Sequence, residues 1–110
     1  MAGIKPPSPM NRNGGKMPRV AITYCRQCNW LLRSAWMAQE LLSTFAEDLG
    51  EVALIPTTGG AFQIEVDGEI IWERQRDGGF PDVQELKRRV RDRIDPGRDL
   101  GHVDRASAAP

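Results

Sequence analysis

The sequence predicts a small α/β domain in which a four-stranded mixed sheet carries two helices on one face. Three observations lead to this fold class: short apolar or alternating runs typical of strands, two longer segments with helical spacing, and one dipeptide favoured in hairpin turns. The predicted order is strand, helix, strand, strand, strand, helix. With 110 residues, of which 40% are hydrophobic, the chain has room for one modest core.

The first three elements form a strand–helix–strand unit. Residues 19–24 are a β-branched, mostly apolar run that fits a central strand, and residues 51–56 form a second one. Between them, from about residue 27 to residue 49, apolar residues recur at steps of three and four, which predicts a helix. This passage is long enough for a right-handed crossover between parallel strands. The stripe expected to face the core is Leu31, Ala35, Ala38, Leu42, Phe45 and Leu49.

The second half of the domain is a hairpin followed by a helix. Residues 62–66 alternate with period two, and Asp67-Gly68 is a favoured two-residue turn because both positions adopt positive φ. Asp82 is placed to cap the last helix, with Glu85 three residues on as in a capping box. The apolar stripe of that helix is Val83, Leu86, Val90 and Ile94.

The returning strand, residues 70–72, predicts an apolar patch on the sheet face that the helices leave uncovered. Strict alternation places Ile70 and Trp72 on the side of Gln63 and Glu65, opposite the core. An apolar patch on a half-open face marks an interaction site. We therefore expect Ile70 and Trp72 to contact the chain's own tail or a protein partner, including a second copy.

The two ends of the chain are predicted to lie outside the domain. Residues 1–18 are rich in Pro, Gly and Asn and read as a disordered arm, residues 19–94 form the domain, and residues 95–110 form a loosely held tail. Within that tail, His102 is expected to be a solvent-exposed residue and not a group that tunes a thiolate.

Charge and hydropathy exclude several function classes. The 15 basic and 15 acidic residues give no net charge, which disfavours binding to nucleic acid or an anionic membrane. The apolar runs fall far short of the roughly 20 residues of a membrane span, and the start lacks the apolar core of a secretory signal. We expect a cytoplasmic protein, in a compartment where structural disulfides are rare.

The only two cysteines, Cys25 and Cys28, form a Cys-x-x-Cys motif between a predicted strand and a predicted helix. The first-turn N–H groups and the helix dipole favour a thiolate there, which lowers a thiol pKa from about 8.5 into a range of roughly 3.5–7.5. The spacing lets the second sulfur close a disulfide and release a mixed-disulfide partner. Arg26, inside the motif, adds a cation that favours the thiolate and a partner.

The helical phase predicts which thiol is exposed. Extending the predicted apolar stripe backward by one turn places Cys28 at its buried edge, so Cys25 is expected to be the accessible thiol. Trp30 is expected to project away from the stripe, on the side of Met37 and Leu41. There it either covers the helix edge or serves as a docking surface for a partner.

Two other uses of the motif remain open. A structural zinc site needs four ligands, which two cysteines and His102 do not supply without carboxylates or a dimer. A Cu(I) ion needs only two thiolates, so a Cu(I) or Zn(II) carrier is one alternative to redox exchange. A protein-interaction adaptor that senses oxidation through the same cysteines is another.

Four passages resemble the selenoprotein W/T/H family, also called the Rdx family. Residues 20–28 (VAITYCRQC) are similar to its first strand and Cys-x-x-Cys or Cys-x-x-selenocysteine motif, and residues 58–66 to the entry into its third strand. Asp67-Gly68 with residues 70–72 resembles its hairpin. Residues 76–81 (RDGGFP) are similar to the loop that bacterial members place before the last helix.

The resemblance implies a thioredoxin-like two-layer sandwich and a thiol-based redox role linked to glutathione. It also implies that Cys28, which stands where relatives carry selenocysteine, is the stronger nucleophile, in conflict with the exposure expected from the helical phase. Thioredoxins have a cis-proline before the third strand, whereas this chain has Gly59 and Gly60, which permit close backbone approach to a ligand.

The function predicted from the sequence is thiol–disulfide exchange through Cys25 and Cys28. Arg26, Trp30, Gly59 and Gly60 are the candidate partner-binding residues. One thiolate attacks a disulfide or peroxide-type oxidant, and the other resolves the product into an intramolecular disulfide. Glutathione or a thioredoxin system is the expected reductant, and no cofactor beyond the thiols is expected.

Overall fold

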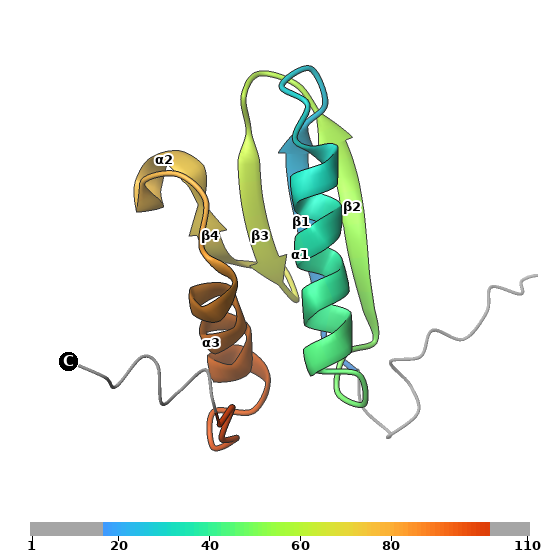
Figure 1. Cartoon of the computed structure of the whole chain (residues 1–110), viewed down its shortest axis with the longest axis vertical. Helices are drawn as coiled ribbons and strands as arrows, with labels where there is room; N and C mark the ends of the chain where they lie inside the picture. The colour runs from blue at the N-terminus through green and yellow to red at the C-terminus, as the bar shows by residue number, and fades with distance from the viewer. Residues whose placement is uncertain (1–16, 102–110) are drawn as a thin grey trace, which may run out of the picture.

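The computed structural model describes residues 17–101, so residues 1–16 of the predicted arm, and His102 with the rest of the predicted tail, lie outside it. Four strands and three helices follow in the order β1 (Arg19–Cys25), α1 (Leu31–Thr44), β2 (Glu51–Thr57), β3 (Phe62–Val66), β4 (Glu69–Glu73), α2 (Arg74–Asp77) and α3 (Val83–Ile94) (Figure 1). The predicted order of strands and long helices is confirmed, and the four-residue helix α2 is additional.

The strands form one mixed sheet in the order β2-β1-β3-β4. β1 is central: it pairs in parallel with β2, so that Val20 lies opposite Val52, and antiparallel with β3, so that Ile22 lies opposite Ile64. The β1–α1–β2 unit is therefore the parallel crossover expected from the sequence. The pairing brings the carboxyl end of β1, which carries the cysteines, next to the start of β3.

Both long helices lie on the same face of the sheet, where the core is found (Figure 1). Alternate residues of β1 and β3 point toward the helices, as the period of a strand requires. Leu86 and Val90 of α3 and Leu41 of α1 meet them and are fully buried. The core residues from the sheet are Val20, Ile22, Tyr24, Phe62, Ile64, Val66, Ile71 and Trp72.

The predicted buried stripe of the first helix is right at Ala38, Phe45 and Leu49, which are buried, but wrong at Leu31 and Leu42, which are 46% and 44% exposed. Met37 and Leu41 are buried in their place. The helix carries apolar residues on two adjoining faces, so periodicity alone does not select the one that packs. The chain enters α1 through Asn29, whose φ is 63°, and this left-handed residue separates the helix from the preceding turn. The residues of the predicted helical segment that are buried are Ser34, Met37, Ala38, Leu41, Phe45 and Leu49.

The predicted apolar patch of Ile70 and Trp72 is also wrong in part, because β4 contains a bulge. Ile64 pairs with Trp72 but Glu65 pairs with Ile70, so one extra residue, Ile71, is inserted between them. A bulge changes the side-chain alternation, and Ile71 and Trp72 both enter the core. Trp72 is only 7% exposed and its indole N–H donates to the Gly79 carbonyl at 2.8 Å. Ile70 alone stays 39% exposed.

Two local predictions are confirmed. Asp67 and Gly68 have φ values of 50° and 87°, as the hairpin turn requires. Asp82 caps α3 by accepting a hydrogen bond from the Glu85 N–H at 2.8 Å. The Glu85 carboxylate does not complete a capping box, because it accepts hydrogen bonds from Arg88 and Arg89 instead.

Candidate functional site

The Cys-x-x-Cys motif lies at the end of the sheet, where β1 leads into α1. Cys25 is the last residue of β1, and residues 26–29 form a turn before α1 begins at Leu31. The Arg26 N–H donates to the Thr57 carbonyl at 2.9 Å, which ties this turn to the end of β2. The sequence predicted that Cys28 belongs to the first turn of the helix. In the structure it lies before the helix, in the turn of residues 26–29.

The two sulfurs face each other. Both cysteines are free thiols, their Sγ atoms are 2.7 Å apart, and the Cys28 thiol donates to the Cys25 sulfur. A disulfide bond is about 2.05 Å long, so a small movement joins the two sulfurs. The motif thus has the proximity that intramolecular disulfide formation requires.

The predicted exposure of the two thiols is reversed in the structure. Cys25 is only 1% exposed, whereas Cys28 is half-buried. The prediction extended the wrong stripe of α1 backward. The turn of residues 26–29 folds back over the end of β1, so the first cysteine is the enclosed one. Cys28 is the thiol that an incoming partner reaches.

Backbone N–H groups act on the Cys25 sulfur. The hydrogen bond from Cys28 lowers the pKa of Cys25; burial opposes this shift, while the N–H groups of Gly60, Cys28 and Gln27 lower the pKa further. A negative charge on the pair is therefore favoured on the buried sulfur. Its stabilisation comes from the turn itself and from Gly60, and not from the first turn of the helix as expected.

The pKa of Cys28 is shifted in the opposite direction. Its hydrogen bond to Cys25 raises the pKa, and burial and the Cys25 charge add to that rise. The charge of Arg74 and the Gly60 N–H lower it in part. The two shifts mean that Cys25 gives up its proton before Cys28, and that Cys28 keeps the proton that remains on the pair.

The loop before β3 positions the Gly60 peptide beside the sulfurs. Gly59 and Gly60 have φ values of 80° and 74°, a left-handed conformation that glycine adopts without strain. The Gly60 N–H acts on both sulfurs, and its carbonyl accepts a hydrogen bond from Arg74 Nε at 3.3 Å. Gly59 is exposed at the outer side of the loop.

An aromatic cluster covers the helix side of the motif. The ring of Trp30 meets that of Phe80 edge to face at 5.0 Å, and Phe80 packs on Phe62 at 4.6 Å. Trp30 is partly buried and packs against the core, because the face of α1 that carries Met37 and Leu41 is the buried one. The cluster joins the loop before α3 to the start of α1.

Two arginines that the sequence did not single out complete the cluster. The Arg74 guanidinium lies 5.3 Å from the centroid of the Trp30 ring, and that of Arg33 lies 4.4 Å from the Phe80 ring. Phe80 belongs to the RDGGFP passage, so the resemblance carried a signal for it. Nothing local in the sequence brings Arg74 to Gly60, because that contact depends on the pairing of β3 with β4.

A cavity lies beside the motif, next to the turn that contains Arg26 and Asn29. Its volume is about 440 Å³, and it is lined by Tyr24, Arg26, Asn29, Leu31 and Leu32. Leu32 is 81% exposed, and Arg26 is exposed beside it. Of the predicted partner-binding residues, the structure therefore brings Gly60 to the sulfurs, places Trp30 in the adjoining aromatic cluster, and places Arg26 on the opposite side of the motif.

Among residues 17–101 no group of three or more histidines, cysteines or carboxylates is arranged to hold a metal ion. None of the helices in that part of the chain has the length and apolar character needed to cross a membrane.

The fold and the cysteine pair define a thioredoxin-like protein with a Cys-x-x-Cys motif at the end of its central strand. The model of the Rdx family matches residues 19–92, and the chain belongs to that family. The matched segment includes the whole sheet and most of α3.

The chain is also similar to two solved structures and to a mouse protein. A selenoprotein W-related protein from Vibrio cholerae is 57% identical, with a TM-score of 0.71 over 73% of this chain and 100% of that one. A protein from Bordetella parapertussis is 65% identical, with a TM-score of 0.69 over 70% and 98% of the two chains. Mouse migration and invasion enhancer 1 is 26% identical over 87 residues, which are 77% of this chain and 72% of the mouse protein.

Proposed function

We propose that the chain is a thiol–disulfide exchange protein that works through Cys25 and Cys28 in cytoplasmic redox balance. The observation that carries the proposal is the pair of free sulfurs 2.7 Å apart, one buried among N–H donors and one within reach of a partner. Membership of the Rdx family supports a thiol redox role. Two free thiols suit a reducing compartment.

In the proposed first step, the exposed sulfur attacks. The Cys28 sulfur bonds to one sulfur of a partner disulfide while its proton passes to the Cys25 thiolate, which lies at hydrogen-bond distance. The bond between the two partner sulfurs breaks, and one half leaves as a thiolate. The products of this step are a mixed disulfide on Cys28 and a protonated Cys25.

In the second step, Cys25 resolves the mixed disulfide. The departing thiolate takes the Cys25 proton, and the Gly60, Cys28 and Gln27 N–H groups favour the charge that remains on sulfur. The Cys25 thiolate then attacks Cys28 Sγ and releases the second half of the partner. The two thiols have become one disulfide, the partner disulfide has become two thiols, and glutathione or a thioredoxin system returns the pair to its reduced state.

Single cysteine variants test this order of attack. Reduced Cys25→Ser keeps the exposed thiol but lacks the resolving one, so it should accumulate a mixed disulfide with bis(2-hydroxyethyl) disulfide, visible by intact mass. Reduced Cys28→Ser keeps only the buried thiol and should react more slowly than Cys25→Ser by about tenfold or more. The double serine variant is the control for reaction elsewhere.

The outcomes separate the parts of the proposal. Faster trapping on Cys28→Ser means that Cys25 attacks first and that the assigned order is wrong. If neither variant is trapped while both remain folded by circular dichroism, the exchange function itself is wrong. Tight, stoichiometric Cu(I) binding by the wild type together with no exchange would favour the metal-carrier alternative.

A further inference from the structure

Within residues 17–101, eight of the 11 basic side chains have a carboxylate partner. The same residues include 14 carboxylates, so partners for the basic side chains are plentiful. Because each pair lies on the surface or half-buried, it contributes little to stability but cancels the local charge. The pairs are Arg19–Glu51, Arg76–Asp77, Lys87–Glu40, Arg88–Glu85, Arg89–Glu85, Arg91–Asp92, Arg93–Glu69 and Arg98–Asp48.

Three arginines in this part of the chain have no carboxylate partner: Arg26, Arg33 and Arg74. They come from the turn, from α1 and from α2, and all three lie in the motif or in the aromatic cluster beside it. Arg26 lies inside the motif, Arg33 lies over Phe80, and Arg74 lies over Trp30 and donates to the Gly60 carbonyl. Of the three, Arg74 acts on the Cys28 sulfur through its charge. The arginines of the described domain that lack a carboxylate partner are thus grouped at this end of the molecule.

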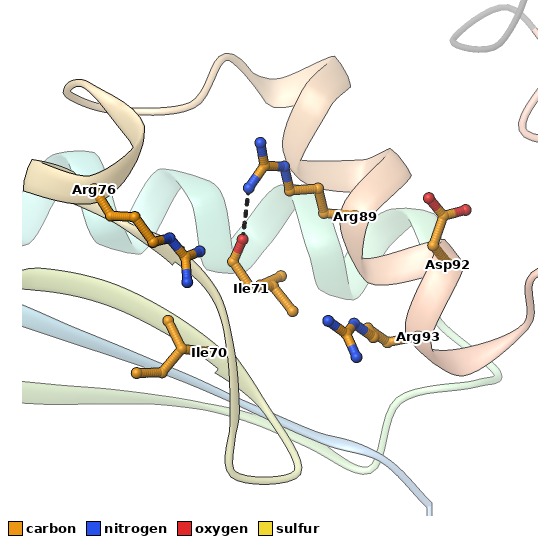
Figure 2. Close-up of a pocket in the computed structure, with 6 residues that line it drawn as sticks. All are labelled: Ile70, Ile71, Arg76, Arg89, Asp92 and Arg93. Carbon is orange, nitrogen blue, oxygen red and sulfur yellow. Dashed lines mark hydrogen bonds between the residues drawn. The ribbon is translucent and has the colours of Figure 1, made fainter.

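A second group of arginines shows the contrasting arrangement. Arg76, Arg89 and Arg93 line a cavity of about 330 Å³ between β4, α2 and α3, over Ile70 and Ile71 (Figure 2). Each has a carboxylate partner, and Arg89 also donates to the Ile71 carbonyl at 2.7 Å. A cavity whose cations are already neutralised gives little attraction to an anion, so it is not the site of charge recognition.

We infer that Arg26, Arg33 and Arg74 form a cationic recognition surface that selects a disulfide partner carrying carboxylates beside its sulfur. This inference rests on the proposed exchange function and names the class of substrate. Charges of one sign around a reactive group raise the local concentration of oppositely charged partners and speed their encounter. Guanidinium groups bind carboxylates through paired N–H donors.

The three arginines have different roles within this surface. Arg26 and Arg33 lie at its rim, where they attract a partner without touching the sulfurs. Arg74 also positions the Gly60 peptide, whose N–H acts on both thiols. Removing Arg74 should therefore change the chemistry of the thiols as well as the choice of partner, whereas removing Arg26 or Arg33 should change only the choice of partner.

Each exchange follows the balanced steps given above, with the carboxylates as bystanders. The protein sulfur bonds to the partner sulfur, the partner disulfide bond breaks, and the departing thiolate carries its carboxylate away. Both protein thiols are oxidised to one disulfide and one partner disulfide is reduced to two thiols. The arginines take no part in electron transfer.

Three small disulfides of different charge test the inference. The reduced protein is mixed with dianionic 3,3′-dithiodipropionate, neutral bis(2-hydroxyethyl) disulfide or dicationic cystamine, and each rate is divided by that of dithiothreitol with the same probe. We expect the normalised rate to fall from the dianion to the dication by about tenfold or more at low salt. This difference should shrink at 1 M salt, where the Debye length is about 3 Å.

Glutamine variants assign the effect to residues. Arg26→Gln, Arg33→Gln and Arg74→Gln should each reduce the preference for the dianion, and the triple variant should abolish it. Arg93→Gln is the matched control, because it removes a paired arginine of the Figure 2 cavity. Among the single variants, only Arg74→Gln should shift the pH midpoint of thiol alkylation upward. Arg74→Lys should restore the charge preference but only part of the midpoint, because Lys keeps the charge that lowers the pKa of Cys28 and loses the guanidinium contact with Gly60.

Alkylation also separates this inference from the proposed function. Anionic iodoacetate and neutral iodoacetamide modify a thiol without any exchange, so their rate ratio reports the charge around Cys28 even in a protein that exchanges with no disulfide. If the triple glutamine variant and the wild type give the same iodoacetate-to-iodoacetamide ratio and the same order of disulfides, the inference is wrong. A charge preference in alkylation with no exchange at all would overturn the proposed function alone.

A peptide arm identifies the source of the carboxylates. A short cysteine peptide flanked by glutamates, supplied as its symmetric disulfide, is compared with the same peptide carrying glutamines. A preference for the glutamate peptide that the triple variant loses supports an acidic polypeptide as the partner. A preference confined to dithiodipropionate supports a small carboxylate-bearing thiol.

Discussion

Arginines have opposite roles in two regions of the molecule, beside the thiols and against strand β4. Beside the thiols, Arg74 has only a backbone carbonyl and an aromatic ring as partners. Against the bulged strand β4, Arg89 bonds to Glu85 and to the Ile71 carbonyl and lies 4.6 Å from the Trp72 ring. Arg89 is neutralised and holds elements together, whereas Arg74 remains available to the chemistry of a neighbouring sulfur.

The difference teaches that the net charge of a chain does not show where its unpaired charges lie. Carboxylates pair with the arginines of α3, whereas within residues 17–101 the arginines near the thiols have no carboxylate partner. We expect substitutions around α3 to change stability without changing thiol chemistry. Substitutions around Gly60 and Arg74 should change thiol chemistry and cost comparatively little stability.

The largest expected effect on stability comes from comparing Trp72, which lies beside Arg89, with Trp30, which lies beside Arg74. Trp72→Ala removes a buried ring and its hydrogen bond to Gly79, and should lower the free energy of unfolding by about 3–5 kcal/mol. Trp30→Ala removes a half-buried ring and should cost clearly less. Urea unfolding of both variants measures the difference, and equal losses would contradict the assigned burial.

Trp72 also shows how much of the fold could be predicted from the sequence. The order of elements, the parallel crossover, the hairpin turn and the Asp82 cap follow from local periodicity and turn chemistry, and the structure has them. The side of β4 that Trp72 faces does not follow, because a single inserted residue at Ile71 reverses the alternation.

The candidate site was predictable to the same limited degree. The Cys-x-x-Cys spacing and the Gly59-Gly60 loop identify the sulfurs and the peptide beside them. The exposure of the two thiols depends on the phase of α1, which two adjoining apolar faces and the left-handed Asn29 decide. The Arg74–Gly60 contact depends on strand pairing, and no local pattern encodes it.

The next largest effect sharpens the comparison of the two arginines. Arg89→Gln should lower the free energy of unfolding by about 1–3 kcal/mol, because the Ile71 carbonyl loses its charged donor and Glu85 keeps only the one from Arg88. Arg74→Gln should cost less than about 1 kcal/mol, the usual contribution of an exposed cation–π contact. Urea unfolding and thiol titration of both variants check this prediction: Arg89→Gln should mainly lower stability, and Arg74→Gln should mainly change the thiol titration. If both variants lose stability equally and change the titration equally, the contrast between the two arginines is wrong.

A glycine pair isolates the role of the Gly60 peptide. Gly60 and Gly68 both have positive φ and room for a Cβ, so alanine at either position should cost about 1 kcal/mol of strain. Only Gly60→Ala should raise the pH at which the thiols are half alkylated by iodoacetamide. If Gly68→Ala raises it as much, the effect belongs to general destabilisation and not to the Gly60 N–H.

The smallest expected effect is a dependence of stability on pH that comes from two carboxylates near α3, Asp77 and Glu85. A hydrogen bond from Arg76 lowers the pKa of Asp77, and hydrogen bonds from Arg89 and Arg88 outweigh burial to lower that of Glu85. A lowered folded pKa stabilises the protein fully above the unfolded carboxyl pKa of about 4. That contribution is lost as the pH falls from there through the folded values.

Unfolding measured between about pH 6 and pH 3 tests this pH dependence. Asp77→Asn should flatten the acid limb of the stability curve, and it should leave the pH dependence of thiol alkylation as it is in the wild type. An unchanged acid limb would mean that the Asp77 carboxylate titrates alike in the folded and unfolded chains.

The central claim is that Cys25 and Cys28 exchange two electrons as one unit. The most direct test is to equilibrate the wild-type chain in glutathione buffers of increasing oxidation, block free thiols, and measure the intact mass. We predict a single two-electron transition to a species that has lost two hydrogens and has no alkylatable thiol. Stable glutathione adducts on separate cysteines, or two thiols that remain free throughout, would contradict the account.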